Sequence, residues 1–263
     1  MDLQIDGNAA LVTASSSGLG KASAKALARE GANVVINGRN EGRLNAAAEE
    51  IREGADGKVV TCSGDLTVAA DIERMVERTV GEFGGMDHLV TSAGGPPSGP
   101  FAETDEEDWY DAYELLVMSV VRLIHESTEH LQASGGGTVL NITSHSVKEA
   151  IDSLVLSNSV RMGVIGLEKT LSRELAPEVR VNAVLPASHE TQRIVDLIKA
   201  AVERGEYDSY AEGREAWADD IPLGQLGDPD RLGDMVAFLS SFRAEHVNGQ
   251  AIVLDGGSGR SNL

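Results

Sequence analysis

The chain has 263 residues and a hydrophobic fraction of 41%, which suffices for one large core. Its formal net charge of −20, from 42 acidic and 22 basic residues, excludes a nucleic-acid partner, which would need the opposite sign. The absence of an apolar run of about 18 residues excludes a membrane partner, and the single cysteine, Cys62, excludes an internal disulfide. With no export signal at the start, we expect a cytoplasmic protein.

Seven short apolar runs alternate with longer segments of helical periodicity. The runs are 9–14, 33–38, 58–63, 87–93, 137–143, 179–186 and 250–257. Gly31, Gly54 and Gly84 fall where C-terminal helix caps are expected. Near-continuous apolar runs are typical of parallel strands covered on both faces. We predict an α/β fold with a single Rossmann-type domain (residues 1–263), a doubly wound sheet of seven mostly parallel strands flanked by helices.

The segment 187–227, between the sixth and seventh runs, is too long for a simple crossover. Its start has the pattern of an amphipathic helix. The apolar positions are Ile194, Val195, Leu197, Ile198, Ala201 and Val202. Since ligands bind beyond the carboxyl ends of strands, we predict a substrate lid, with a subunit contact as the alternative. Its acids, among them Glu203, Glu206, Asp208 and Glu212, weakly disfavour an anionic substrate.

Thr13–Gly20, TASSSGLG, follows the first strand and opens the first helix. Small residues let the backbone approach a pyrophosphate, and the helix N-terminus offers unpaired N–H groups. We therefore predict a dinucleotide site here. A tight turn without a ligand is the alternative.

TASSSGLG resembles the TGxxxGIG loop of the short-chain dehydrogenase/reductase family, and further motifs follow in the family's order. They are Asp65-Leu66, Thr91-Ser92-Ala93-Gly94 (similar to NNAG), NITS at 141–144, RVNAVLP at 180–186 and VNGQAIVLDGG at 247–257. The resemblance, which includes 3-oxoacyl-ACP-reductase-like members, spans nearly the whole chain. It implies an oxidoreductase that uses a nicotinamide dinucleotide and a small carbonyl or alcohol substrate.

The resemblance also implies which positions contact the dinucleotide. They are Thr13, Ser15, Ser16, Ser17, Gly18, Leu19, Gly20, Asn37, Arg39, Asn40, Asp65, Leu66, Ser92, Ala93, Gly94, Arg161, Pro186, Ala187 and Thr191. Ala14 stands where the family usually has its first glycine. If this position needs a positive φ, the alanine costs about 1 kcal/mol.

The end of the second strand indicates which cofactor is preferred. An acid there would bind the ribose 2′-hydroxyl of NAD(H), and an arginine would accept the 2′-phosphate of NADP(H). The chain has Asn37-Gly38-Arg39-Asn40, with no acid. Because Arg39 can make charge-assisted bonds to phosphate, we predict NADP(H), with NAD(H) as the alternative. Arg39 as an ordinary solvated arginine is the competing interpretation.

The family's catalytic set is Asn-Ser-Tyr-Lys, and the resemblance implies that this chain keeps one of the four. The serine is Ser144, whereas Ser157, Arg161 and Leu116 stand at the tyrosine, lysine and asparagine positions. Arg161 keeps the charge, but Ser157 is a far weaker and shorter acid than tyrosine. Since general acid–base catalysis contributes roughly 10²–10⁴-fold, we predict a slow enzyme with an altered proton path through these residues.

Other side chains are candidates for the missing acid. His145 and His189 are alternatives, because histidine titrates near neutral pH. Tyr110 and Tyr113 are interpreted as packing residues. No cluster has metal-ligand spacing, so no metal site is expected.

Three functions fit these observations. The first is an NADP(H)-dependent oxidoreductase, supported by the nucleotide motifs and Ser144. The second is a dinucleotide-binding pseudoenzyme that acts as a sensor or scaffold, supported by the combined loss of Asn, Tyr and Lys. The third is a lyase similar to halohydrin dehalogenases, which pair Ser and Tyr with Arg.

The surface composition supports two further predictions. Acids are spread along the chain and lysine is scarce, as in proteins of salt-loving organisms, where ions screen self-repulsion. An ordinary acidic protein is the alternative. The apolar segments 109–131 and 157–175 are long enough for a second hydrophobic face, and the resemblance implies a homo-oligomer, which we expect to be a tetramer.

Overall fold

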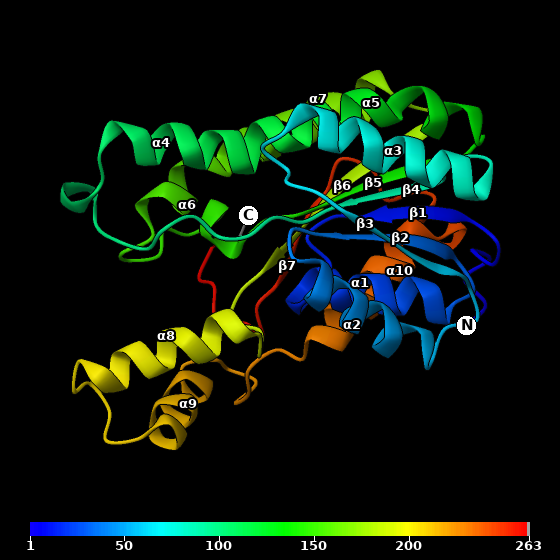
Figure 1. Cartoon of the computed structure of the whole chain (residues 1–263). Helices are drawn as coiled ribbons and strands as arrows, with labels where there is room; N and C mark the ends of the chain where they lie inside the picture. Colours follow the sequence, from blue (N-terminus) through cyan, green and yellow to red (C-terminus); the bar gives the residue numbers. More distant parts are fainter. Residues whose placement is uncertain (262–263) are drawn as a thin grey trace.

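A seven-stranded parallel sheet forms the centre of the protein in a computed structural model that describes residues 1–261 (Figure 1). The strands are β1 (Ala9–Val12), β2 (Asn33–Gly38), β3 (Val59–Ser63), β4 (His88–Thr91), β5 (Gly137–Ile142), β6 (Val179–Pro186) and β7 (Ala251–Leu254). Their order is β3-β2-β1-β4-β5-β6-β7, and each neighbouring pair is parallel. The predicted fold class is confirmed. The order reverses between β1 and β4, where such sheets bind ligands at the carboxyl edge.

Helices cover both faces of the sheet (Figure 1). One layer consists of α1 (Gly18–Arg29), α2 (Glu41–Arg52) and α10 (Pro229–Ser240), and the other of α3 (Ala69–Phe83), α5 (Ser119–Ala133) and α7 (Met162–Glu174). Successive strand residues point to opposite layers, so buried Leu11 packs in one core and buried Val12 in the other. Both faces are covered, which explains the near-continuous apolar runs.

The remaining helices surround the carboxyl edge of the sheet. They are α4 (Glu106–Tyr113), a π-helical turn (Glu114–Met118) that joins α4 to α5, α6 (Val155–Val160), α8 (Gln192–Glu203) and α9 (Tyr210–Asp219), with 3₁₀ turns at 101–103 and 145–147. A further 3₁₀ turn at 242–244 joins α10 to the start of β7. α8 and α9 pack against each other beside the sheet (Figure 1). Within residues 1–261, no helix is long and apolar enough to cross a membrane.

Several predicted boundaries differ from the structure. β1, β4 and β7 end at Val12, Thr91 and Leu254, two or three residues before the apolar runs do, because the chain there turns into the loops of the carboxyl edge. Gly31 and Gly84 have left-handed φ angles of 90° and 81°. Gly54 also lies at the predicted end of α2, directly after the C-cap Glu53. Its φ is not left-handed, and its N–H donates to the Ile51 carbonyl (3.2 Å) in a tight turn.

One carboxyl is buried in the helical layer that contains α7. Glu168 is 1% exposed, and its Oε1 has no hydrogen-bond partner. Burial raises the pKa of Glu168 to about 7 from an ordinary value of 4.5. At neutral pH this position therefore destabilises the folded chain through a poorly solvated charge.

Candidate active site

Buried side chains fix the loop after β1. The Thr13 hydroxyl donates to the Ser92 carbonyl (2.7 Å) and accepts from the Ser92 N–H (2.9 Å), which joins this loop to the end of β4. The Ser15 hydroxyl donates to the Val12 carbonyl (2.6 Å). The side chains of Thr13 and Ser15, both predicted cofactor contacts, therefore point into the protein and shape the loop.

Asn37 connects the ends of three strands. Its side-chain oxygen accepts from the Ala14 N–H (3.1 Å), and its amide donates to the carbonyls of Cys62 (3.2 Å) and Gly64 (3.1 Å). The residue is 1% exposed, so this predicted cofactor contact acts through the loops it holds. Cys62 is buried beside it, and burial raises the pKa of the Cys62 thiol.

Ala14 has a φ of 45°, which is in the left-handed region. The sequence left open whether this position needs a positive φ, and the structure shows that it does. A residue with a Cβ pays a steric penalty of about 1 kcal/mol there relative to glycine. The bond from its N–H to Asn37 holds this conformation.

The start of α1 is shaped to receive an anion. A Cβ on Gly20 would lie 2.6 Å from the Ala14 carbonyl oxygen, so only glycine lets the helix begin this close to the loop. The N-cap Ser17 makes no side-chain capping bond, and the first turn has no acid. The Thr191 methyl lies 3.7 Å from the place of a Cβ on Gly18, which brings the start of α8 to the same point.

Ser16, Ser17, Gly18 and Leu19 are at least partly exposed beside these free N–H groups. This arrangement is typical of helix N-termini that bind phosphate. The residues present therefore fit the pyrophosphate of a dinucleotide.

An open depression lies where β2 and β3 end. Arg39, with its side chain 82% exposed, lines it, and its Nη1 is 3.7 Å from Asp65 Oδ2. Arg74 also lines it, held by Asp71 (2.6 Å) and the Ser63 carbonyl (2.6 Å), and was not identified from the sequence. Hydrogen bonds from Thr67, above all from its backbone N–H, hold the pKa of Asp65 below its usual range.

The other predicted cofactor contacts lie at the ends of β2, β3, β4 and β6, and some are occupied by contacts within the protein. Asn40 caps α2 by accepting from the Arg43 N–H (2.9 Å), and Leu66 is buried. Ser92, Ala93 and Gly94 follow β4 directly. Pro186 ends β6, and the Ala187 N–H donates to the Leu254 carbonyl (3.1 Å).

Three serines and an arginine meet beyond the end of β5. The Ser144 hydroxyl accepts from the Ser146 N–H (3.1 Å), and the Ser146 and Ser157 hydroxyls are 3.1 Å apart. Arg161 Nε donates to the Ser157 hydroxyl (3.2 Å) from one helical turn further on. The structure thus brings together the predicted catalytic residues and adds Ser146. Nothing in the sequence distinguished Ser146 from other loop serines.

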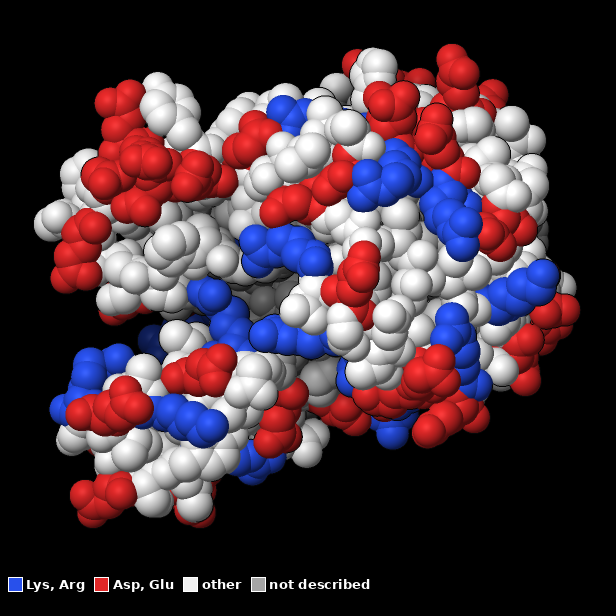
Figure 2. Space-filling model, in the orientation of Figure 1, with Lys and Arg blue, Asp and Glu red and all other residues white. Residues whose placement is uncertain are grey.

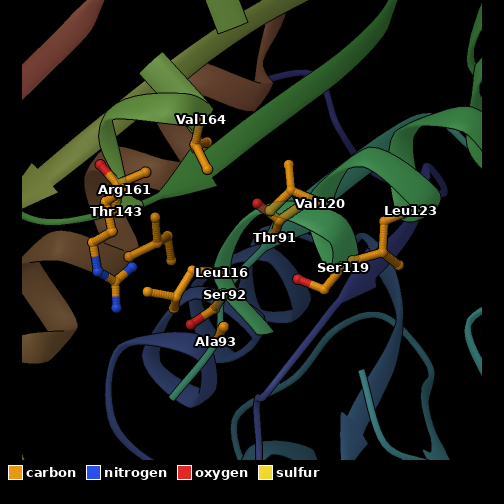
Figure 3. Close-up of a pocket in the computed structure, with 11 residues that line it drawn as sticks. Thr91, Ser92, Ala93, Leu116, Ser119, Val120, Leu123, Thr143, Arg161 and Val164 are labelled. Atoms are coloured by element: carbon orange, nitrogen blue, oxygen red, sulfur yellow. The ribbon is translucent and has the colours of Figure 1, made fainter. Parts of the chain in front are cut away.

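Arg161 is 8% exposed, and its Nη2 points to the Gly94 carbonyl (3.5 Å). Burial and the nearby charge of Arg193 lower the pKa of Arg161 to about 10, so it stays protonated at neutral pH. Its side chain extends toward Leu116, which lies in the π-helical turn (Figure 3). Both line a cavity of ≈ 10 Å³, room for about one water molecule.

Neither alternative acid turns toward these serines. His145 Nε2 lies 3.7 Å from Asp255 Oδ2, beyond the end of β7. The His189 ring packs against Gly227, where a Cβ would be 2.7 Å from it, and burial lowers its pKa. Within residues 1–261, no group of His, Cys, Asp or Glu side chains is arranged to hold a metal ion.

The prediction that Tyr110 and Tyr113 are packing residues is wrong for the single chain. They are 67% and 50% exposed, because they lie on the outer face of α4, whose only buried residue is Ala112. Phe101, 71% exposed, makes an edge-to-face contact with Trp109 nearby.

Residues 13–259 match the family described as Enoyl-(Acyl carrier protein) reductase. The chain is 30% identical over 256 residues to the 3-oxoacyl-[acyl-carrier-protein] reductase FabG of Thermotoga maritima, covering 97% of this chain and 99% of that protein. L-sorbose reductase from Gluconobacter frateurii, solved with NADPH and L-sorbose, has a TM-score of 0.93 and 30% identity, covering 99% and 100%. A 7α-hydroxysteroid dehydrogenase solved with NADH and 7-oxo glycochenodeoxycholic acid has a TM-score of 0.88 and 26% identity, covering 100% and 98%.

Proposed function

Because the chain belongs to the short-chain dehydrogenase/reductase family, whose members here are oxidoreductases, we propose that it is an NADP(H)-dependent reductase of small carbonyl compounds with an atypical proton path. The dinucleotide, when bound, supplies or accepts the hydride. The observation that carries the proposal is the cluster beyond β5. There the Ser146 N–H donates to the Ser144 hydroxyl, the Ser146 and Ser157 hydroxyls pair, and Arg161 Nε donates to the Ser157 hydroxyl.

The proposed proton path uses hydroxyls in place of a phenol. Ser144 orients the substrate oxygen, and the Ser146–Ser157 pair passes a proton by donating one and accepting another. Arg161 fixes the Ser157 hydroxyl and stabilises negative charge without giving up its own proton. Water is the proton source, so we expect slow turnover.

The proposed preference for NADP(H) rests on the chain's own residues, since relatives solved with NADPH and with NADH both share the fold. Gly38 leaves the end of β2 without an acid, and Arg39 is exposed and only loosely paired. Arg74 adds a second guanidinium to the same depression. A 2′-phosphate there would make charge-assisted bonds.

Titration of NADPH and NADH, followed by fluorescence in high salt, tests the cofactor. We expect NADPH to bind more tightly, and Arg39→Ala to weaken NADPH about tenfold while leaving NADH unchanged. Arg43→Ala, on the exposed face of α2, is the matched control. Equal binding of the two dinucleotides would contradict the NADP(H) preference, and no binding of either would overturn the proposed function.

Two variants test the proton path once a substrate is found. Ser157→Ala should lower kcat roughly 10²-fold with little change in KM for NADPH, because the hydroxyl chain is broken. Ser157→Tyr should give a kcat equal to or above that of the parent, because tyrosine is the stronger acid and the longer side chain. Unchanged kcat in Ser157→Ala would rule out the serine relay.

A dinucleotide-binding pseudoenzyme is the second candidate. It is favoured by Leu116, 2% exposed, which places an apolar wall where a relay group is expected. Absorbance at 340 nm in single-turnover experiments decides between the reductase and the pseudoenzyme. If NADPH binds but no carbonyl compound in a broad screen oxidises it, the pseudoenzyme is supported.

We further propose that residues 187–227 act as a lid within a single domain, and that the chain forms a tetramer. Exposed Tyr110, Tyr113 and Met162, on α4 and α7, supply the apolar contact area for the tetramer. The proposed tetramer is tested by light scattering in high salt, and a measured mass equal to that of one chain would contradict it.

The acidic surface visible in Figure 2 supports adaptation to high salt. The cytoplasmic location stays a prediction.

A further inference from the structure

Two arginines, Arg161 and Arg193, point at the loop after β4, and neither has an acidic partner in the described part of the chain. Arg161 bonds to the Ser157 hydroxyl and the Gly94 carbonyl. Arg193, the second residue of α8, donates to the Ser98 hydroxyl (3.2 Å) and the Pro96 carbonyl (3.4 Å). All these partners are neutral. Within residues 1–261, neither arginine forms an ion pair, although most arginines of the chain do.

Arg193 is fitted closely to the loop after β4. A Cβ on Gly95 would lie 2.5 Å from Arg193 Nη1, so glycine is needed for this contact. The contact joins α8 to the loop that starts at Gly94, where Arg161 also points. Both guanidinium groups are thus directed at one stretch of backbone, close enough that the charge of Arg193 acts on Arg161.

Arg161, which is buried, is costly here without an anion, whereas Arg193 is exposed. A buried cation that lacks a charged partner loses solvation, and a second cation nearby adds repulsion. The chain has 42 acids to draw on, so the lack of a carboxylate at this place is notable. Figure 2 shows basic side chains at the mouth of a cleft, on a face that elsewhere carries many acids. A planar anion would complete the site, since guanidinium binds carboxylate through two parallel bonds.

We propose that Arg161 and Arg193 bind a carboxylate of the substrate, which makes the substrate an oxo acid. This inference rests on the proposed function. It reverses the expectation that the acids of residues 187–227 disfavour an anionic substrate. Glu206 pairs with Arg204 (2.6 Å), and Glu212 accepts from the Asp208 N–H (2.8 Å), so both carboxylates already have partners within their own segment.

The cofactor's pyrophosphate is the other source of an anion. Its place is at the start of α1, beside Gly18 and Thr191, whereas Arg161 contacts the Ser157 hydroxyl of the proposed proton path. A group held by Arg161 therefore lies next to the reacting atoms. This position assigns Arg161 to the substrate, and Arg193 is included because it contacts the same loop after β4.

Matched pairs of substrates test the inference: 2-oxobutyrate and acetoacetate, each against its methyl ester, at fixed NADPH and ionic strength. We expect kcat/KM for at least one acid to exceed that of its ester about tenfold or more, as for one charged hydrogen-bonded contact. Arg193→Gln should remove most of this preference and leave the ester within about twofold. Arg173→Gln, an exposed arginine of α7 with the same charge change, should alter neither.

A binding measurement separates this inference from the proposed function. Calorimetric titration of the parent with butyrate and with butyramide, with and without NADP⁺, should show butyrate binding that Arg193→Gln weakens about tenfold. If NADPH binds and the esters are reduced as fast as the acids, the oxo-acid substrate is overturned, whereas the proposed reductase function stands. Arg193→Gln that weakens NADPH, with no butyrate binding, would assign the arginine to the pyrophosphate and also overturn it.

Discussion

The two halves of the carboxyl edge differ in how completely their polar groups are satisfied. Around β1, β2 and β4, Thr13 and Asn37 use their side chains fully on neighbouring loops. Around β5 and α7, Arg161 lacks an acidic partner, and both Glu168 Oε1 and Asn141 Nδ2 are buried without hydrogen bonds. Natural proteins leave such groups mainly where ligands or function require them. The first half is a preformed scaffold, and the second is the half at which we propose that a ligand binds.

Breaking the satisfied half should have the largest effect. Asn37→Ala would remove the side-chain partner of the Ala14 N–H and of two carbonyls, one buried and one partly buried, at about 1–3 kcal/mol each before relaxation. We expect the free energy of unfolding to fall by about 4 kcal/mol and dinucleotide affinity to fall with it. Denaturant unfolding, with the midpoint and the m value fitted separately, measures this. Asn40→Ala is the control and should cost only about 1 kcal/mol, the loss of a helix cap.

A buried carboxyl sharpens the description of the incomplete half. Because the pKa of Glu168 is raised in the folded state, its contribution to stability is complete below pH 4.5 and is lost as the pH rises through about 7. Glu168→Gln should therefore leave stability near the parent at pH 5 and raise it by up to about 3 kcal/mol at pH 8. Thermal melts at both pH values measure this, with exposed Glu174→Gln as the control. An equal effect at both pH values would show that packing, and not charge, is responsible.

The smallest expected effect concerns the one strained point of the scaffold. Ala14→Gly removes a Cβ from a left-handed conformation and should stabilise the protein by up to about 1 kcal/mol. The gain is partly offset by the added freedom of the unfolded chain. We also expect NADPH to bind as tightly as in the parent or more tightly. A loss of stability would mean that the alanine methyl contributes packing that outweighs the strain.

The fold could be predicted from the sequence because each strand is buried on both faces and so appears as an apolar run. All seven strands were found, including the four-residue β4 and β7, although their carboxyl ends were placed too late. The exposure of Tyr110 and Tyr113 could not be predicted, because a tyrosine at a helical position is compatible with packing or with solvent.

The candidate site was predicted only in part. Ser144, Ser157 and Arg161 were identified through the family resemblance and the positions it implies, and the structure places them in one hydrogen-bonded cluster. Ser146 was missed because a serine in a loop carries no mark of its partners, and Arg193 because its contacts join segments far apart in the chain. Arg193 contacts Ser98, 95 positions away, and occupies an ordinary place in an amphipathic helix. No local pattern marks such a residue.

The single cysteine gives the scaffold half a built-in reporter. Cys62 is buried on β3, and its carbonyl accepts from Asn37, so a thiol reagent reaches the sulfur only when this edge of the sheet opens. With no second thiol in the chain, the rate of labelling reads out one local opening event. Slower labelling in the presence of a dinucleotide would then measure how far ligand binding restrains opening at this one position of β3.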